Sequence, residues 1–425
     1  MNLIQLKKAE IKLPEIKKDI PLEKSPEVEK LIINLKYGDS FDFQPIIKQG
    51  EKVSAGQIIA RTENGFTLRA PLPGEISGIE NRFSSLGEKT PAIILNVEKV
   101  ETSPVPISNK PPEKRASEII NQLLSTGVNT PWTFDSELSG DVVKKVLINC
   151  VDEEPGFINN RMCLRNNYDA IIKSLNILKI LAPVAKIYLA VDEADYSSVK
   201  GKFPNNVEVL SIPYNYLDRL EHYIVNRLLG FKRPAWKKYK EYGMVVIKAE
   251  DLLSVYNAIY LRIPNIKKRI SVFSDFMDNP KYIEVFYGTP IRDILKTLNI
   301  NVEEGERVNI GGPMKGFSQF DLDISLTMFS DGIYLKKDTK KSFVENYPCI
   351  NCGSCTRICP ENLQVHLITR RSEFYYFEEA LKLGAGACIK CGLCSYVCPA
   401  HRPLVQYIKF ALDEATLEKQ NELEE

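Results

Sequence analysis

The sequence predicts a multidomain protein that combines α/β and β domains with a helical C-terminal domain. Its 425 residues correspond to about three domains at roughly 150 residues per domain. Strand-like runs broken by glycine turns fill the first hundred residues, and strands alternate with amphipathic helices in the middle of the chain. Eight of the ten cysteines lie between Cys349 and Cys398. Such clustering in a long chain predicts metal binding rather than disulfides.

The composition excludes several classes of protein. Hydrophobic residues make up 44% of the chain, which is enough for several packed cores and excludes a largely disordered protein. The 56 Lys and Arg nearly balance the 55 Asp and Glu, so no basic excess is available for nucleic acid. The most apolar stretch, residues 180–191, contains Lys186 and is shorter than the ~20 residues of a membrane-spanning helix. With no secretory signal pattern at the N-terminus, we expect a cytoplasmic protein without a transmembrane segment of its own.

The N-terminal hundred residues are expected to form an arm and a β domain. Residues 1–35 are rich in lysine and glutamate and are expected to be the arm. Residues 36–101 contain two similar halves, in each of which a glycine turn, at Gly50 or Gly74, precedes a strand of branched residues. This repeat resembles the barrel-sandwich fold of lipoyl and biotinyl domains. Glu-Asn-Gly at 63–65 replaces the carrier lysine of those domains, so we expect a scaffold.

A proline-rich linker at 102–116 leads into a domain expected over residues 117–265. Short apolar runs at 145–148, 185–191 and 207–212 predict buried strands, and residues 169–182 predict an amphipathic helix between them. Strands that alternate with helices indicate an α/β domain with a mostly parallel sheet.

Three further parts complete the expected organisation. A second β module is expected over residues 266–336, where short strands surround the turn Gly311-Gly312-Pro313. A helical domain that contains the clustered cysteines follows at 340–412. The tail at 413–425 holds six acids and one lysine and is expected to be solvated.

The clustered cysteines form two copies of the motif Cys-x2-Cys-x2-Cys-x3-Cys-Pro. This is the spacing of bacterial ferredoxins with two [4Fe–4S] clusters, in which the fourth cysteine of each motif binds the other cluster. Zinc ribbons use two Cys-x2-Cys pairs instead, so the spacing favours iron–sulfur clusters. The predicted ligands of cluster 1 are Cys349, Cys352, Cys355 and Cys398, and those of cluster 2 are Cys388, Cys391, Cys394 and Cys359.

The remaining reactive side chains carry no recognisable motif. Cys150 and Cys163 are expected to be small buried residues rather than ligands. His222, His366 and His401 are isolated from one another and are expected to be surface or capping residues. No Walker loop, Gly-x-Ser-x-Gly elbow or His-Glu-x-x-His motif is present, so a hydrolase has no support.

Over roughly residues 30–412, the order of these parts resembles the C subunit of Rnf-type, ion-translocating electron-transport complexes. VLINCVDEEPGFINNR at 146–161 is similar to the Asn-x-x-Glu-x-Glu-Pro segment that the family shares with the flavin-bearing subunit of respiratory NADH dehydrogenases. GTPIRDIL at 288–295 and GGPMKG at 311–316 resemble its soluble-ligand-binding-type β-grasp module. ACIKCGLCSYVCP at 387–399 and PLVQYI at 403–408 resemble its cluster domain.

The resemblance implies a peripheral subunit on the inner face of the cell membrane, with other subunits of the complex as partners. It also implies an α/β domain like the family's FMN- and NADH-binding domain. In the family this subunit binds FMN and NAD(H) and passes electrons between them and the complex through its two clusters. The same resemblance implies that Glu154 and Pro155 lie at the FMN site.

The sequence departs from the family where flavin and nicotinamide are expected. The family has a loop of the form GxGGAGFPT, and such loops let backbone N–H groups reach phosphates at a helix start. Residues 125–133 read STGVNTPWT instead, with Gly127 alone and the bulky Trp132. Residues 212–219 read IPYNYLDR and lack a second family glycine. Either an altered loop binds FMN, or the chain has lost the ability to bind FMN and NAD(H). In the second case it exchanges electrons with a ferredoxin-like protein or a flavoprotein.

We therefore expect an electron-transfer subunit that relays electrons through two [4Fe–4S] clusters and has no catalytic residue of its own. One alternative is a self-contained flavin-dependent reductase that oxidises NADH, for example to serve a corrinoid protein. The other alternative is a non-catalytic assembly module whose clusters only stabilise the fold. Flavin content tests the first alternative, and redox cycling of the clusters tests the second.

Overall fold

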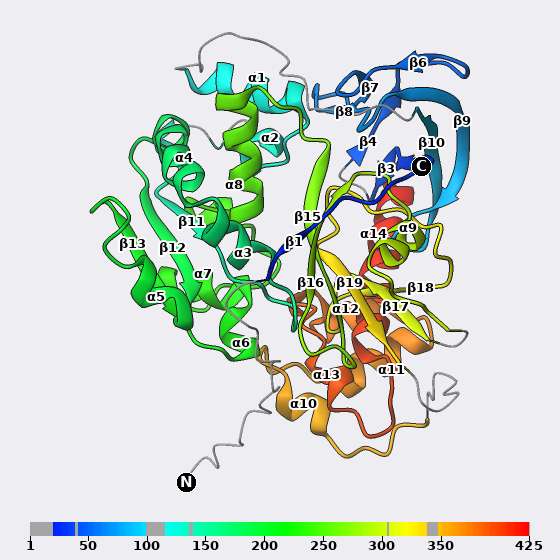
Figure 1. Cartoon of the computed structure of the whole chain (residues 1–425). Coiled ribbons are helices and arrows are strands. Elements are labelled where there is room, and N and C mark those ends of the chain that lie inside the picture. The colour runs from blue at the N-terminus through cyan, green and yellow to red at the C-terminus, as the bar shows by residue number, and fades with distance from the viewer. Residues whose placement is uncertain are drawn as a thin grey trace.

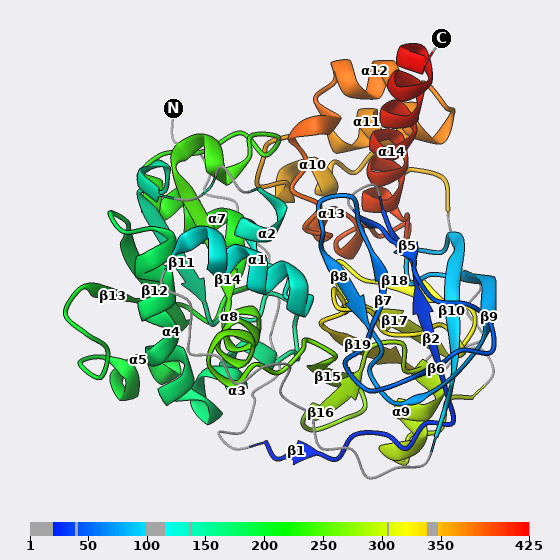
Figure 2. The same cartoon turned by 90° about the horizontal axis from the view of Figure 1, so that it is seen from above.

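The computed structural model describes residues 20–38, 41–98, 115–135, 138, 140–303, 306–337 and 347–424, with side chains described as far as residue 415. The expected linker at 102–116 and tail at 413–425 lie largely outside these described residues and side chains. The α/β domain lies on one side of the molecule, the two β domains lie on the other, and the helical C-terminal domain packs against them (Figures 1 and 2).

Two small sheets enclose the core of the N-terminal β domain, with strand orders β2-β10-β9-β6 and β5-β7-β8. The strands are β2 (Lys30–Asn34), β5 (Gln44–Pro45), β6 (Lys52–Val53), β7 (Ile58–Arg61), β8 (Thr67–Arg69), β9 (Gly74–Phe83) and β10 (Lys89–Val97), beside the antiparallel pair β3 (Lys36–Tyr37) and β4 (Phe41–Asp42). Alternate side chains point between the sheets and bury Leu31, Ile33 and Ile93. Because β2 begins at Lys30, the segment expected to be an arm ends inside this domain.

The chain before β2 reaches a different sheet. Strand β1 (Leu22–Glu23) pairs in parallel with β16 (Lys281–Phe286) of the second β module, and Leu22 lies opposite Tyr282. Lys281 Nζ lies 3.3 Å from Glu23 Oε1. The described end of the expected arm is therefore a sheet strand that joins two parts distant in sequence.

The α/β domain contains a four-stranded sheet in which all neighbours are parallel, as the alternating pattern predicts, with the order β13-β12-β11-β14. Its strands are β11 (Lys145–Asn149), β12 (Lys186–Asp192), β13 (Val207–Ile212) and β14 (Met244–Lys248). Its helices are α1 (Ala116–Thr126), α2 (Pro131–Phe134), α3 (Asn159–Asn166), α4 (Tyr168–Leu181), α5 (Glu193–Val199), α6 (Tyr216–Arg219), α7 (Glu221–Leu229) and α8 (Ala249–Tyr256).

The helices cover both faces of this sheet. Helices α1, α4 and α8 pack on one face, where they bury Val146 and Ile148, and α7 packs on the other face, against Leu147. The chain runs from β11 outward through β12 to β13 and then returns to place β14 on the opposite side of β11. The carboxyl ends of β11 and β14 therefore flank the point at which the strand order reverses, where open α/β sheets bind ligands.

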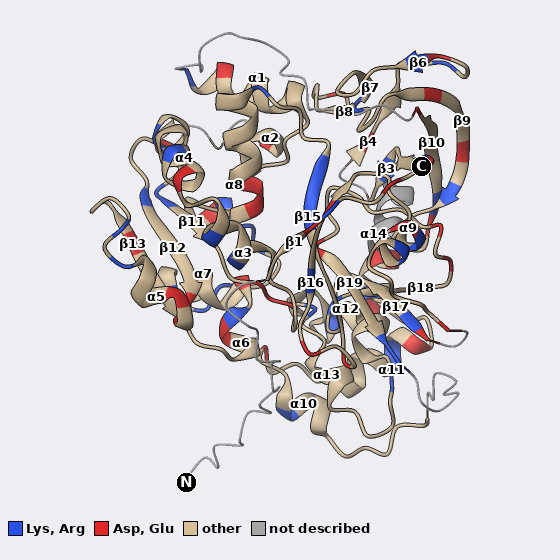
Figure 3. Ribbon diagram, viewed as in Figure 1, with Lys and Arg blue, Asp and Glu red and all other residues tan. Residues whose placement is uncertain are grey.

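The second β module is a six-stranded sheet with the order β1-β16-β15-β19-β17-β18. Its other strands are β15 (Lys267–Ser274), β17 (Arg307–Ile310), β18 (Phe317–Gln319) and β19 (Gly332–Lys336). Helix α9 (Ile291–Thr297) buries Ile291, Ile294 and Leu295 against it. We call this part the six-stranded domain. Charges of both signs are interspersed over the chain, with a short basic run at the start of β15 (Figure 3).

The C-terminal domain is built from helices α10 (Ser354–Ile358), α11 (Val365–Glu373), α12 (Phe377–Lys382), α13 (Leu393–Tyr396) and α14 (Leu404–Glu424). Val365, Ile368, Leu404 and Ile408 form its core, and α14 projects beyond the rest of the molecule (Figure 2). Gly353 and Gly392 precede α10 and α13 with φ of 73° and 81°, a conformation that glycine adopts without strain. Within the described part of the chain, no helix combines the length and apolar character needed to cross a bilayer.

Candidate functional site

The motif cysteines gather in two groups that mix residues of both motifs. Burial raises the pKa of the Cys355 thiol, and the neighbouring thiols of Cys349 and Cys398 raise it further. Cys352 is exposed on the same loop, with its sulfur 3.5 Å from Ser354 Oγ. The second group surrounds Cys394, whose pKa is raised by burial and then by Cys388, Cys391 and Cys359. Each group therefore combines cysteines of one motif with the last cysteine of the other.

The second group encloses a small cavity. Cys359, Cys388, Cys391 and Cys394 all line it, and its other walls include the apolar side chains of Leu363, Val365, Leu393, Val405 and Ile408. Four thiols around an apolar space fit a [4Fe–4S] cluster, which is held by four thiolates.

The two groups differ in exposure. In the first group Cys349 and Cys352 are exposed, and Ile350 between them is 66% exposed. In the second group Cys391 and Cys394 are buried. The first group therefore opens to the surface, while the second lies inside the molecule where domains meet.

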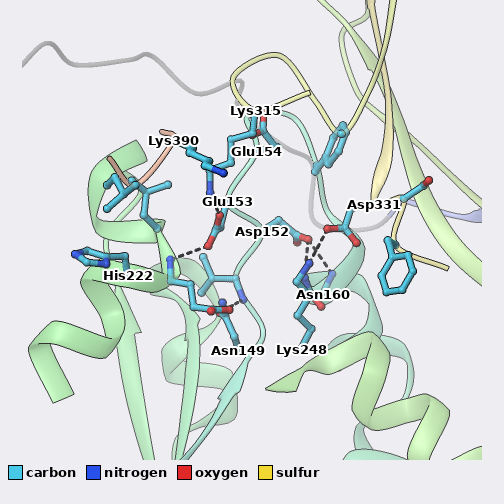
Figure 4. A pocket seen from close by; sticks show the side chains of 18 of the residues that line it. Asn149, Asp152, Glu153, Glu154, Asn160, His222, Lys248, Lys315, Asp331 and Lys390 are labelled. Carbon is cyan, nitrogen blue, oxygen red and sulfur yellow. Dashed lines mark hydrogen bonds and ion pairs between the residues drawn. The ribbon is translucent and has the colours of Figure 1, made fainter. Parts of the chain in front are cut away.

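A cavity of about 680 Å³ begins directly beside the second group. Its wall includes Cys388 and Lys390 from the C-terminal domain, Asn149 and Lys248 from the carboxyl ends of β11 and β14, and Lys315 from the six-stranded domain. Figure 4 shows Lys315, Glu153 and Lys390 at one end of this cavity and Lys248, Asp331 and Asn160 at the other. The cavity thus occupies the crevice that the strand order predicts.

Two ion pairs join charged side chains that line the cavity. Asp331 accepts from Lys248 at 2.6 Å and from Lys268 at 2.7 Å; burial opposes their effect, but together the two ammonium groups lower its pKa below its ordinary value. Lys315 forms an ion pair with Glu153. Burial raises the pKa of Asp152 to about 6. Lys248 and Lys315 are therefore each balanced by a carboxylate, and Arg233 and Lys390 are the other cations of the lining.

Glu154 joins the α/β domain to the six-stranded domain. Its Oε2 accepts the Met314 N–H at 2.8 Å, and Gly312 approaches so closely that a Cβ there would meet the carboxylate. Burial raises the pKa of Glu154 to about 7, although the Met314 N–H opposes the rise. Glu154 lines the large cavity and Pro155 is not among its lining residues. Met314 also contacts the loop that carries Cys388, Cys391 and Cys394, which we call the cluster loop. A Cβ on Gly392 of this loop would meet the Met314 carbonyl.

The loop expected to hold the flavin phosphate lies away from the large cavity. None of residues 125–133 lines that cavity. Trp132 is fully buried in the core of the α/β domain, and its indole N–H donates to the Leu138 carbonyl at 3.0 Å. Thr130 Oγ1 accepts the Thr133 N–H and so caps α2. This helix start is closed by its own side chains, and Trp132 fills space that small residues would leave open.

The other departing segment, residues 212–219, contacts the cluster loop. The Tyr216 hydroxyl, which is buried, donates to the Cys391 carbonyl at 2.6 Å. Arg219 Nε donates to the Asp152 carbonyl at 2.9 Å, and its guanidinium pairs with Asp192. Sequence reasoning missed Tyr216, since nothing in a tyrosine-rich turn indicates a partner 175 residues away.

His222 corrects one expectation, because it is only 8% exposed and is not the capping residue of α7, the helix on which it lies. Its Nδ1 lies 2.9 Å from Arg233 Nη2, and its Nε2 lies 3.5 Å from Glu361 Oε1. The guanidinium can only donate, so Nδ1 accepts and Nε2 carries the proton. His222 is buried because it lies on α7 where the α/β and C-terminal domains meet, and burial lowers its pKa.

The other two histidines were expected to be surface or capping residues, and the two cysteines outside the motifs were expected to be buried. His401 is exposed, and His366 is half-buried with Nδ1 3.1 Å from Thr356 Oγ1. Cys150 and Cys163 are buried in the core of the α/β domain. Burial raises the pKa of both thiols well above the ordinary value, which leaves them unreactive.

Comparisons with known proteins match both ends of the chain. Residues 8–100 match the RnfC barrel-sandwich hybrid domain, and residues 340–399 match a 4Fe–4S dicluster domain. The C subunit of the proton-translocating ferredoxin:NAD(+) oxidoreductase complex of Clostridium ljungdahlii is 26% identical over 93% of this chain and 90% of its own length. The Na(+)-translocating counterpart of Acetobacterium woodii is 24% identical over 92% of each. This chain is a homologue of Rnf C subunits.

A further relative supports the same family. The C subunit of the ion-translocating oxidoreductase complex of Rhodobacter capsulatus is 26% identical over 87% of this chain and 74% of its own length. The predicted resemblance to Rnf C subunits is thereby confirmed, as are the barrel-sandwich and iron–sulfur parts of the predicted fold. The matched domains and homologues support an electron-transfer subunit and do not favour the reductase or the assembly module.

One solved structure shares part of the backbone arrangement. A chain of the NAD+-reducing [NiFe]-hydrogenase in the H2-reduced state has a TM-score of 0.46 and 14% identity, and covers 70% of this chain and 62% of its own. This likeness is too slight to carry a functional argument.

Proposed function

We propose that this Rnf C homologue is an electron-transfer subunit of an Rnf-type complex, in which it relays single electrons through two [4Fe–4S] clusters. The observation that carries the proposal is the arrangement of the two cysteine groups, one inside the molecule beside the large cavity and one open to the surface. In each step one electron leaves one centre and enters the next, and no bond is made or broken. The cysteines are cluster ligands and take no part in acid–base chemistry.

The ligands are assigned from the two groups. Cluster 1 is held by Cys349, Cys352, Cys355 and Cys398, and cluster 2 by Cys388, Cys391, Cys394 and Cys359. The proximity of Cys355 to Cys398 and of Cys394 to Cys359 supports this assignment. Cluster 1 exchanges electrons with a partner subunit at the exposed loop around Ile350. The partners are the other subunits of the complex, on the inner face of the membrane.

We also propose that the relay works without FMN or NAD(H) bound to this chain, because the residues present do not fit a flavin phosphate. The start of α2 is capped by Thr130, and Trp132 is packed into the core. Lys248 and Lys315, which line the cavity, are each engaged by a carboxylate. Electrons then come from a protein-bound redox centre, such as that of a ferredoxin-like protein or a flavoprotein.

Redox cycling tests the relay itself. Protein purified without oxygen is expected to hold both clusters and to show their EPR signals on reduction with dithionite. Those signals are expected to disappear when an oxidised ferredoxin-type acceptor is added and the clusters give up their electrons. Clusters that stay in one redox state throughout would instead support the assembly module.

The flavin content tests the second part of the proposal. We expect the same preparation, after acid denaturation, to release close to no flavin per chain, because the start of α2 is capped by Thr130 and two lysines of the cavity are engaged by carboxylates. The measurement is fluorescence of the released flavin, with iron per chain as the control for an intact protein. About one FMN per chain in a fully iron-loaded sample would contradict the proposal and favour a flavin-dependent NADH-oxidising reductase.

A further inference from the structure

Lys409 on α14 extends its ammonium group into the junction with the six-stranded domain. Its Nζ donates to the Lys315 carbonyl at 3.2 Å and lies 4.3 Å from the centre of the Phe317 ring. A carbonyl oxygen and an aromatic face both attract a cation, but neither carries a net charge. These contacts therefore hold the ammonium in place without neutralising it.

No carboxylate among the described residues comes within ion-pair distance of the Lys409 ammonium. Glu154 and Asp413 attract it from further away, while Lys390 repels it. The Glu154 carboxylate already accepts the Met314 N–H. Lys409 is half-buried, and a cation withdrawn from water without a counter-ion is costly. The position is explained if the ammonium faces a negative charge that no side chain supplies.

The second cysteine group provides such a charge when it binds its cluster. Ile408, the neighbour of Lys409 on α14, lines the small cavity of the second cysteine group. The Lys315 carbonyl that the ammonium contacts follows Met314, whose own carbonyl meets the loop at Gly392 between Cys391 and Cys394. Lys315 lines the large cavity together with Cys388, but its own charge is balanced by Glu153. Lys390 is exposed, so water and salt screen its field. Of these three lysines, Lys409 thus combines shielding from water with an unbalanced charge.

We infer that Lys409 raises the reduction potential of cluster 2 by stabilising its reduced state. One-electron reduction adds a negative charge to a cluster that four thiolates surround, and a fixed cation nearby favours the more negative state. The electron comes from the donor, which is oxidised by one electron, and no proton or bond is exchanged. The inference rests on the proposed function, since it requires cluster 2 to be bound and to cycle.

The test compares potentiometric titrations of the full-length protein followed by EPR. In Lys409→Met, one of the two clusters is expected to shift to a more negative midpoint potential. At the wild-type midpoint its reduced-to-oxidised ratio falls about tenfold, which is about 59 mV for a one-electron couple. Lys409→Gln, whose amide still donates to the Lys315 carbonyl, is titrated alongside and shifts the same way. Lys409→Arg keeps the charge and is expected to stay within about twofold of the wild type.

Lys382 provides the matched control, because it lies in the same domain, is exposed and pairs with Glu378 at 3.3 Å. Lys382→Met is expected to leave both midpoints unchanged. Unchanged midpoints in cluster-loaded Lys409→Met and Lys409→Gln would overturn the inference. An equal shift in Lys409→Arg would also overturn it, since packing rather than charge would be responsible. A wild-type protein whose clusters are absent or never cycle would contradict the proposed function instead.

Discussion

Replacing Cys359 with serine is expected to remove cluster 2, although Cys359 belongs to the first motif. The Cys359 side chain lines the same small cavity as Cys388, Cys391 and Cys394, so its loss leaves three thiolates where four are needed. Iron is expected to fall from about eight to about four atoms per chain, since one of two four-iron clusters is lost. Iron and acid-labile sulfide analysis of protein purified without oxygen checks the result.

Three further serine variants turn this prediction into a test of the crossed arrangement. Cys359→Ser is expected to leave the same EPR spectrum as Cys394→Ser, because both retain only cluster 1. Cys398→Ser is expected to match Cys355→Ser, because both retain only cluster 2. If instead Cys359→Ser matches Cys355→Ser, each motif binds its own cluster and the ligand assignment is wrong.

Trp132→Ala is expected to lower the free energy of unfolding by about 3–5 kcal/mol, the cost of truncating a large buried aromatic side chain. Trp132 is fully buried among the helices and strands of the α/β domain. Its loss also leaves the Leu138 carbonyl without the indole N–H. Urea denaturation followed by circular dichroism measures the change, and Trp132→Phe, which keeps most of the volume, is expected to cost about half as much.

The second tryptophan of the chain is the matched control. Trp236 is 64% exposed, so Trp236→Ala is expected to change the free energy of unfolding by no more than about 0.5 kcal/mol. A small effect of Trp132→Ala, together with flavin bound by the variant, would show that Trp132 lines a ligand pocket. The proposal that the loop at residues 125–133 has become part of the core would then fail.

Local patterns in the sequence predicted much of the fold. The apolar run at residues 207–212 coincides with β13, and the helical pattern at 169–182 differs from α4 by one residue at each end. The strand–helix alternation also predicted the parallel sheet. These successes share one cause, since strand and helix periodicity is set by neighbouring residues.

Contacts between distant residues could not be predicted in this way. His222 was expected to be a surface or capping residue, because a lone histidine on a short helix carries no sign that Arg233 and Glu361 enclose it. The pairing of Glu154 with Met314 spans 160 residues. The cysteine spacing was the exception, because a ligand motif reports contacts that the bound cluster imposes on residues far apart in the chain.

The parallel pairing of β1 with β16 also has a consequence for biosynthesis. Glu23 and Lys281 are separated by 258 residues, and ribosomes add about 5–20 residues per second. About 13–50 s therefore pass between the synthesis of β1 and that of its partner strand. During this interval β1 has no edge to join, and the nascent chain must keep it from pairing elsewhere. A chaperone that holds the emerging N-terminus would thus act on this segment before the six-stranded sheet exists.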